Sequence, residues 1–370
     1  MADKNINILI AGGKTGGHLF PGIAIAQALQ AESPDIKILF AGIGTEFEIK
    51  IINNYNFKHA KLYAKPIKGG NPLNLIFSLS IIPISIIQAL IIIKKFKPSM
   101  VIGTGGYSSF AIVAGAWLLG IKTGIQEQNT IPGLTNRMLS KIVNIIFLTF
   151  KNTKFLSDKK QSVCFGNPVR QVRRTNNISQ ITDMLDKQKF TILISGGSQG
   201  AESINKAMVQ AVKLMENKNQ FNIIHQTGKN DEKQIQEQYL NMGIKNIIVK
   251  AFFNNLGIYQ DMADLIICRA GAGTISEITL KGLPSILIPY PYAADDHQTI
   301  NAKELEKIGA AIIIQDQNLT GSILKQNIEG LAANREKIEK MSELSLSQAM
   351  PDADIKIAQT ILNMIQTQGK

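Results

Sequence analysis

Residues 7–22 read Asn-Ile-Leu-Ile-Ala-Gly-Gly-Lys-Thr-Gly-Gly-His-Leu-Phe-Pro-Gly, and this stretch decides the fold. A short, mainly apolar run ends in a glycine-rich turn, and a helical pattern follows from Pro21 to Leu29. The same plan returns later: an apolar run at 190–195 leads into Gly-Gly-Ser-Gln-Gly-Ala at 196–201 and then into helical spacing. The sequence therefore predicts two copies of a unit made of a strand, a glycine turn and a helix.

Further strand candidates alternate with helical stretches in both halves of the chain. They lie at residues 36–41, 99–103, 123–126, 222–226, 246–249, 265–268, 285–289 and 311–314. Strands that alternate with helices predict parallel sheets covered on both faces. We therefore expect an α/β fold with two Rossmann-like parallel-sheet domains. The first is predicted at 1–166 with a C-terminal helix at about 351–370, and the second at 167–350, with 165–175 as the linker.

Four glycine clusters follow predicted strands, two in each half. They lie at residues 12–17, 103–106, 196–200 and 271–273. Ligands of open parallel sheets bind beyond the carboxyl ends of the strands, so two domains with facing glycine turns would enclose one cleft. A glycine turn that opens a helix offers backbone N–H groups to a phosphate, although a tight turn without a ligand is the alternative for any one cluster. None of them matches the ATP-binding loop, and the first lacks the glycine spacing of the dinucleotide fold.

Positive charge is concentrated in the first half of the chain. Residues 1–166 hold 18 Lys and Arg against 7 Asp and Glu, a balance of +11, whereas the whole chain carries +12. This asymmetry favours an anionic partner, either nucleic acid or a lipid surface; a basic surface that serves only solubility is the alternative. Aromatic residues, 6% of the chain, do not interleave with basic clusters. We therefore expect no nucleic-acid partner.

The cysteines and the amino terminus favour the cytoplasm. Cys164 and Cys268 each close an apolar run, lie far apart in the sequence and are expected to be buried thiols. The opening residues do not read as a signal peptide. The histidines, cysteines and acidic residues show no metal-ligand spacing, so no tightly bound cofactor is implied, and a Mg²⁺ held loosely by a diphosphate stays open.

Residues 76–93 are strongly apolar but contain serines, Pro83 and Gln88. Lysines flank the segment on both sides: Lys65, Lys68, Lys94, Lys95 and Lys97. The polar interruptions argue against a spanning helix, and an internal helix is a second alternative. We favour a helix that dips into the membrane interface while the lysines meet anionic head groups, with Trp117 as a further anchor.

Several segments, in order along nearly the whole chain, together resemble the MurG family of peptidoglycan synthesis. They are residues 12–22, 103–107, 127–129 (Glu-Gln-Asn), 166–170 (Gly-Asn-Pro-Val-Arg), 196–201, 268–277 (Cys-Arg-Ala-Gly-Ala-Gly-Thr-Ile-Ser-Glu) and 297–302 (His-Gln-Thr-Ile-Asn-Ala). The resemblance implies the two-domain GT-B fold and an inverting glycosyltransferase. This family moves N-acetylglucosamine from UDP-N-acetylglucosamine to the C4 hydroxyl of the N-acetylmuramyl unit of lipid I, which gives lipid II for cell-wall growth, cell shape and division. It acts peripherally on the cytoplasmic face of the inner membrane.

The resemblance also assigns donor-binding residues. Glu277 would accept hydrogen bonds from the ribose diol, with a helix-capping carboxylate as the alternative. Arg170 and the backbone at Phe253 would contact the uracil part, although Phe253 also suits plain core packing. Gln298 and Asn129 would form hydrogen bonds with the sugar hydroxyls. The diphosphate would meet N–H groups and hydroxyls of the remaining donor residues: Thr15, Gly16, Gly17, Ser198, Ala272, Gly273, Thr274, Ile275 and Ser276.

His18 is the candidate catalytic base, because inversion needs a group that takes the proton of the attacking hydroxyl and imidazole titrates near neutrality. The alternative is a histidine that positions its loop or a phosphate. Gly105, Gly106 and Tyr107 form the expected acceptor-side loop. Three rival functions share parts of this pattern: a transferase that glycosylates diacylglycerol, a UDP-N-acetylglucosamine epimerase, and a basic membrane- or RNA-binding protein without catalysis.

Overall fold

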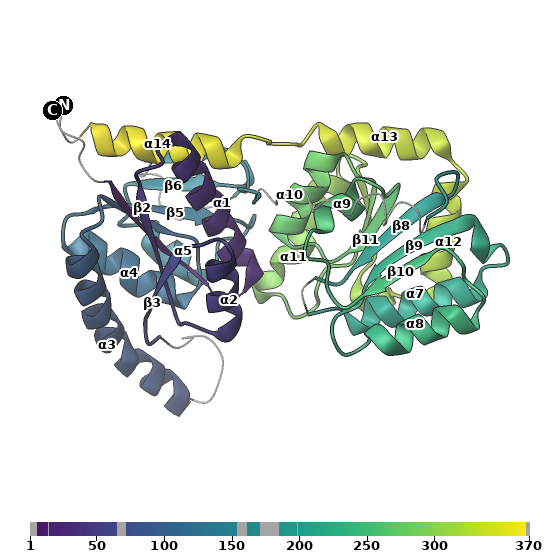
Figure 1. Ribbon diagram of the computed structural model, residues 1–370, viewed down its shortest axis with the longest axis horizontal. Helices are drawn as coiled ribbons and strands as arrows, with labels where there is room; N and C mark the ends of the chain where they lie inside the picture. The colour runs from purple at the N-terminus through teal and green to yellow at the C-terminus, as the bar shows by residue number, and fades with distance from the viewer. Residues whose placement is uncertain are drawn as a thin grey trace. The chain divides into compact units, whose positions relative to one another are not determined.

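The computed structural model describes residues 6–13, 15–64, 72–153, 161–170, 185–197 and 199–367. Contacts divide the chain into two compact units: unit 1 comprises 1–171 with 350–370, and unit 2 comprises 172–349 (Figure 1). Unit 1 thus includes residues 167–171, which the sequence analysis assigned to the second domain. Ser198 and the flanking residues Lys65 and Lys68 lie outside the described residues.

Unit 1 is built on a seven-stranded parallel sheet of order β3-β2-β1-β4-β5-β6-β7. Its strands are β1 (Asn7–Ala11), β2 (Lys37–Gly42), β3 (Lys58–Lys61), β4 (Met100–Gly103), β5 (Lys122–Glu127), β6 (Ile145–Leu148) and β7 (Gln161–Cys164). Its helices are α1 (Gly16–Glu32), α2 (Glu46–Asn54), α3 (Pro72–Phe96), α4 (Tyr107–Leu118), α5 (Leu134–Leu139) and α14 (Ala353–Gln366). The strand order turns back at β1, which pairs with both β2 and β4.

Both faces of this sheet are buried, as the near-continuous apolar strands predict. One core cluster holds Ile8 and Ile10 of β1, and the other holds Leu9 of the same strand. The C-terminal helix α14 completes the first cluster, because Ile357 and Ile361 are fully buried in it. Figure 1 shows α14 beside α1, against which it packs.

One helix of unit 1 begins earlier than predicted. The helix expected from Pro21 begins at Gly16 and takes the proline into its interior. Glycine has the lowest helix propensity after proline, so the composition of residues 12–17 hid this first turn. Helix α3 likewise continues through Pro83. Among the described residues, no helix has both the length and the apolar content that crossing a membrane requires.

Unit 2 carries a six-stranded parallel sheet of order β10-β9-β8-β11-β12-β13. Its strands are β8 (Phe190–Ser195), β9 (Phe221–Gln226), β10 (Ile247–Lys250), β11 (Leu265–Cys268), β12 (Ser285–Leu287) and β13 (Ala311–Ile313). Its helices are α7 (Glu202–Leu214), α8 (Glu232–Asn241), α9 (Leu256–Gln260), α10 (Ala272–Lys281), α11 (His297–Glu306), α12 (Gly321–Ala332) and α13 (Arg335–Leu346). Short 3₁₀ turns lie at η1 (Lys218–Gln220), η2 (Ala294–Asp296) and η3 (Asp316–Asn318).

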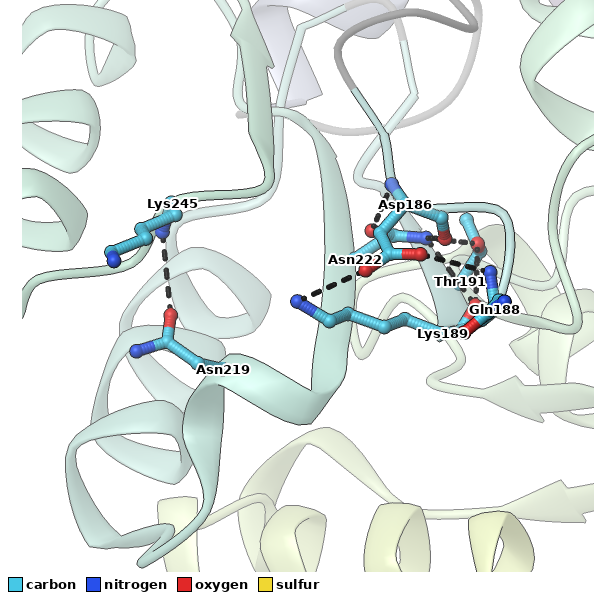
Figure 2. A network of polar contacts seen from close by, with 7 residues as sticks. All are labelled: Asp186, Gln188, Lys189, Thr191, Asn219, Asn222 and Lys245. Carbon is cyan, nitrogen blue, oxygen red and sulfur yellow. Dashed lines mark hydrogen bonds and ion pairs between the residues drawn. The ribbon is translucent and has the colours of Figure 1, made fainter.

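At the amino-terminal ends of the strands of this sheet, a buried side-chain amide on β9 joins that strand to the segment that leads into β8 (Figure 2). Asn222, on β9, donates through Nδ2 to the carbonyl oxygen of Asp186 at 2.8 Å and to Thr191 Oγ1 at 2.9 Å. Its Oδ1 accepts from the backbone N–H of Asp186 at 3.1 Å. Lys189 adds an ion pair to the Asp186 carboxylate at 3.4 Å. One side chain therefore pairs several backbone groups where the chain enters β8.

We expect Asn222→Leu to lower the free energy of unfolding by about 2–4 kcal/mol, because the apolar side chain leaves several polar groups without partners. Urea unfolding followed by circular dichroism measures the change. Asn219→Ala is the control, since its bond from the Lys245 N–H is exposed and should contribute less than about 0.5 kcal/mol. Equal effects of the two substitutions would contradict this account of the cluster.

Candidate active site

The first predicted site residue, His18, lies in the first turn of α1 with its ring orientation fixed. Its Nδ1 is 3.0 Å from the carbonyl oxygen of Thr104 and 3.3 Å from Gln128 Oε1. Both partners are acceptors, so the neutral ring carries its proton on Nδ1, and Nε2 is the basic nitrogen. The ring also needs Gly105: that residue has φ +102°, and a Cβ there would lie 2.7 Å from Nδ1.

The backbone of the first glycine turn packs closely against the side chains of Thr104 and Glu48. A Cβ on Gly12 would lie 2.0 Å from Thr104 Oγ1, and a Cβ on Gly13 would lie 2.0 Å from Glu48 Oε1. The Glu48 side chain is fully buried, and its Oε2 accepts from the N–H of Gly44 at 3.1 Å. The space available at both positions therefore favours glycine.

A pocket of about 250 Å³ in unit 1 brings several predicted residues together. His18, Gly105, Gly106, Tyr107 and Asn129 all line it. The remaining lining residues are Ala64, Ile81, Ile82, Ser85, Phe110, Ala111, Glu127, Gly133, Leu134, Thr135, Asn136 and Met138. The acceptor-side loop thus lies beside the candidate base, and Asn129, expected at the donor, shares their pocket. Burial and then the charge of Glu48 raise the pKa of Tyr107, so its hydroxyl stays protonated near neutral pH.

Glu127 received no role from its residue type, yet it organises the polar wall of this pocket. It is almost fully buried, and its Oε1 accepts from the N–H of Asn129 at 2.8 Å. Its Oε2 accepts from Asn136 Nδ2 at 2.9 Å and from the N–H of Gly133 at 3.3 Å. Burial raises the pKa of the Glu127 carboxyl to about 7, although the hydrogen bonds lower it. Only its place in the Glu-Gln-Asn motif pointed to it in the sequence.

In unit 2, helix α10 presents its amino-terminal turn directly after β11. Ala272, Gly273 and Thr274 form this turn, and Ser276 Oγ donates back to the carbonyl oxygen of Ala272 at 3.0 Å. Glu277 was expected at the helix start, but it lies beyond the first turn, which contains no acidic residue. The capping alternative for Glu277 is therefore wrong.

The other donor candidates of unit 2 each form a hydrogen bond within that unit. Gln298 Oε1 accepts from the N–H of Tyr290 at 3.0 Å. The side chain of Phe253 is buried, and its N–H donates to Gln226 Oε1 at 2.9 Å. Glu277 Oε2 accepts from Gln260 Nε2 at 3.3 Å.

Arg170 lies in unit 1, where its guanidinium carbon stands 3.9 Å from the centre of the Phe20 ring. Thr15, Gly16 and Gly17 open α1 in the same unit, Thr15 as the residue that precedes the helix. Within the described residues, no group of three or more His, Cys, Asp or Glu side chains is arranged to hold a metal ion.

Comparisons with known proteins decide the family. Residues 8–148 match the N-terminal domain of glycosyltransferase family 28, and residues 191–357 match its C-terminal domain. The UDP-N-acetylglucosamine--N-acetylmuramyl-(pentapeptide) pyrophosphoryl-undecaprenol N-acetylglucosamine transferase of Syntrophus aciditrophicus is 39% identical over 98% of this chain and 99% of its own. The protein of the same name from Myxococcus xanthus is 35% identical over 98% and 94%. The crystal structure of Acinetobacter baumannii MurG superimposes with a TM-score of 0.75 at 30% identity, covering 98% of this chain and 99% of that one.

The chain belongs to the MurG family. The predicted family and the predicted GT-B class, with two parallel α/β sheets, are confirmed. The assignments of individual MurG-family site residues remain predictions.

Arg269 is a MurG-motif residue to which the sequence analysis gave no role. Its Nη1 donates to the carbonyl oxygens of Ile288 and Pro289 and pairs with Asp316 Oδ1 at 2.5 Å, while Nη2 donates to Ser203 Oγ. The guanidinium therefore ties the loop before α10 to the end of β12, to η3 and to α7. Its motif was visible in the sequence, but its partners are distant along the chain.

The raised pKa of Glu127 predicts that the free energy of unfolding depends on pH. The folded-state pKa of about 7 lies above the ordinary 4.5, so the carboxyl stabilises the fold most when protonated, and this contribution falls as the pH rises from 4.5 through 7. Between pH 4.5 and pH 8, we expect the free energy of unfolding of the wild type to fall by up to about 3 kcal/mol relative to that of Glu127→Gln. Urea unfolding of both proteins at several pH values measures this difference. A difference that is independent of pH would show that Glu127 ionises normally.

Proposed function

We propose that this protein is the inverting transferase that moves N-acetylglucosamine from UDP-N-acetylglucosamine to the C4 hydroxyl of the N-acetylmuramyl unit of lipid I. The product is lipid II, the lipid-linked precursor of peptidoglycan. The observation that carries the proposal is identity of 35–39% along nearly the whole chain to transferases whose name specifies this donor and this acceptor.

The donor site in this proposal belongs mainly to unit 2. The N–H groups that open α10 would stabilise the diphosphate and support its departure with the electron pair of the broken bond. Glu277 would accept from the ribose hydroxyls, and the backbone at Phe253 would meet the uracil ring. Gln298 would contact the sugar, with Asn129 of unit 1. We assign no tightly bound metal, and a Mg²⁺ loosely bound by the diphosphate is compatible with this scheme.

The acceptor site would be the pocket of unit 1. His18 Nε2 would take the proton from the C4 hydroxyl while that oxygen attacks the anomeric carbon from the face opposite the diphosphate, and inversion follows. The Nδ1–H bond to the Thr104 carbonyl supports this role, because it fixes the tautomer that leaves Nε2 basic. The proposal requires the carboxyl-terminal strand edges of the two units to share one cleft, as the sequence predicts.

Two substitutions separate donor binding from chemistry. Glu277→Ala should weaken UDP-N-acetylglucosamine binding by at least about tenfold, since one charge-assisted hydrogen bond pair is lost. His18→Ala should lower kcat by about 10²–10⁴-fold and change donor affinity by less than about threefold. Titration calorimetry and steady-state kinetics with lipid I give both quantities. Equal losses of affinity and turnover in His18→Ala would instead make His18 a binding residue.

Exposed apolar side chains of α3 and α4 support a peripheral membrane site on unit 1. Ile84, Ile87 and Ile91 are 50–61% exposed and recur at helical spacing on one face of α3. Helix α4 packs against α3 and ends in exposed Trp117 and Leu118. Lys94, Lys95 and Lys97 follow the isoleucines. We propose that this face, the isoleucine face, inserts into the anionic cytoplasmic surface of the inner membrane.

Replacing Ile84, Ile87 and Ile91 by serine should reduce binding to vesicles of phosphatidylglycerol and phosphatidylethanolamine by at least about tenfold, because each isoleucine loses apolar burial. Co-sedimentation measures the bound fraction. Activity toward a detergent-soluble, short-chain lipid I should stay within about twofold of wild type. Ile49, exposed on α2, provides the control substitution Ile49→Ser. Undiminished sedimentation of the triple variant would refute the membrane face.

The rival functions differ in their products. Glycosylation of diacylglycerol in place of lipid I would identify the lipid transferase. Conversion of UDP-N-acetylglucosamine to its epimer without an acceptor would identify the epimerase. Transfer of the sugar to lipid I alone would exclude both.

A further inference from the structure

Gln226 joins two segments of unit 2 that are expected at different parts of the donor: the turn at Gly197, through its neighbour Ser198, at the diphosphate, and the backbone at Phe253 at the uracil. It is the last residue of β9, and it is 2% exposed. In the sheet register it stands between Ser195, the last residue of β8, and Lys250, the last residue of β10. A side chain in this position can reach the loops that follow both neighbouring strands.

Both ends of the Gln226 amide are used. Its Nε2 donates to the carbonyl oxygen of Gly197 at 3.0 Å and to Ser195 Oγ at 3.2 Å. Its Oε1 accepts from the N–H of Phe253 at 2.9 Å. The donors and acceptors also fix the amide orientation, since a flipped amide would set Nε2 against the Phe253 N–H.

The backbone around this amide is packed too tightly to adjust by itself. Gly200 and Gly228 both have positive φ, and a Cβ on Gly200 would lie 2.1 Å from the carbonyl oxygen of Thr227. The N–H of Gly228 donates to the carbonyl oxygen of Ala251 at 3.0 Å. The turns that follow β8, β9 and β10 therefore form one hydrogen-bonded surface with Gln226 at its centre.

We infer that Gln226 is a positioning residue for the donor, which holds the glycine turn at Gly197 and the peptide at Phe253 in one arrangement. The inference rests on the proposed function, in which Phe253 lies at the uracil, and on the family resemblance, which assigns Ser198, the residue after Gly197, to the diphosphate. Its consequence is that base and diphosphate are bound as a unit: an amide that pre-orients both segments removes the cost of ordering each one separately.

The test compares two buried amides on the same strand. Gln226→Met keeps the length and apolar volume of the side chain and removes every hydrogen bond. Asn222→Leu does the same at the opposite end of β9, where no donor group is proposed. Titration calorimetry with uridine and with UDP is carried out on the full-length wild type and on both variants, at a temperature where circular dichroism shows all three folded.

We expect Gln226→Met to lower the affinity for uridine about threefold and the affinity for UDP at least about tenfold. The diphosphate would then add less to the binding affinity than it does in the wild type. Asn222→Leu should bind both ligands within about twofold of wild type, although it is less stable. A purely structural Gln226 would give the two variants the same affinities, and that outcome overturns the inference. Wild type that binds no UDP would overturn the proposed function instead.

If Gln226→Met does not fold, Gln226→Glu replaces it. Its carboxylate still accepts from the Phe253 N–H at pH 8 but donates nothing to the Gly197 carbonyl. Uridine affinity should then stay within about twofold of wild type while UDP affinity falls by at least about tenfold. Unchanged UDP affinity in this variant would again overturn the inference.

Discussion

Close contact between glycine backbone and neighbouring segments at the carboxyl ends of parallel strands is the constraint on which both units depend. At these edges Gly12 meets the side chain of Thr104, and Gly200 meets the carbonyl oxygen of Thr227, at distances that leave no room for a Cβ. The resulting turns are rich in glycine, which leaves their backbone N–H groups with little cover from their own side chains. A ligand at such an edge therefore meets atoms whose positions are set by the sheet itself.

The architecture was predictable because its signals are local. Apolar runs that end in glycine gave the strands β1 and β8, and their alternation with helices gave the parallel sheets. Errors arose where local propensity is weak. The glycines at 16 and 17 concealed the first turn of α1, which was expected to begin at Pro21. In α1, packing of Leu19 and Ile23 against the sheet outweighs the low intrinsic helix propensity of these glycines.

Site residues were predictable where they lie in recognisable motifs. They were not predictable where their role depends on buried contacts with distant residues. His18, Gly105, Tyr107 and Asn129 were assigned from motifs, and the structure places them around one pocket. Glu127 and Gln226 act through partners on other strands and loops, so residue type alone could not reveal them. The position of Arg170 in unit 1 depends on where the chain leaves the first sheet, which composition does not fix.

The return of the last helix to unit 1 has a consequence for biosynthesis. The hydrophobic core around β1 includes Ile357 and Ile361, which leave the ribosome after every residue of unit 2. Unit 2 is contiguous in the sequence and all its strands are synthesised before α14, so it is free to fold during translation. Unit 1 can complete its core only after α14 has been synthesised. A premature stop codon immediately before α14 would therefore leave unit 2 complete and remove part of the core of unit 1.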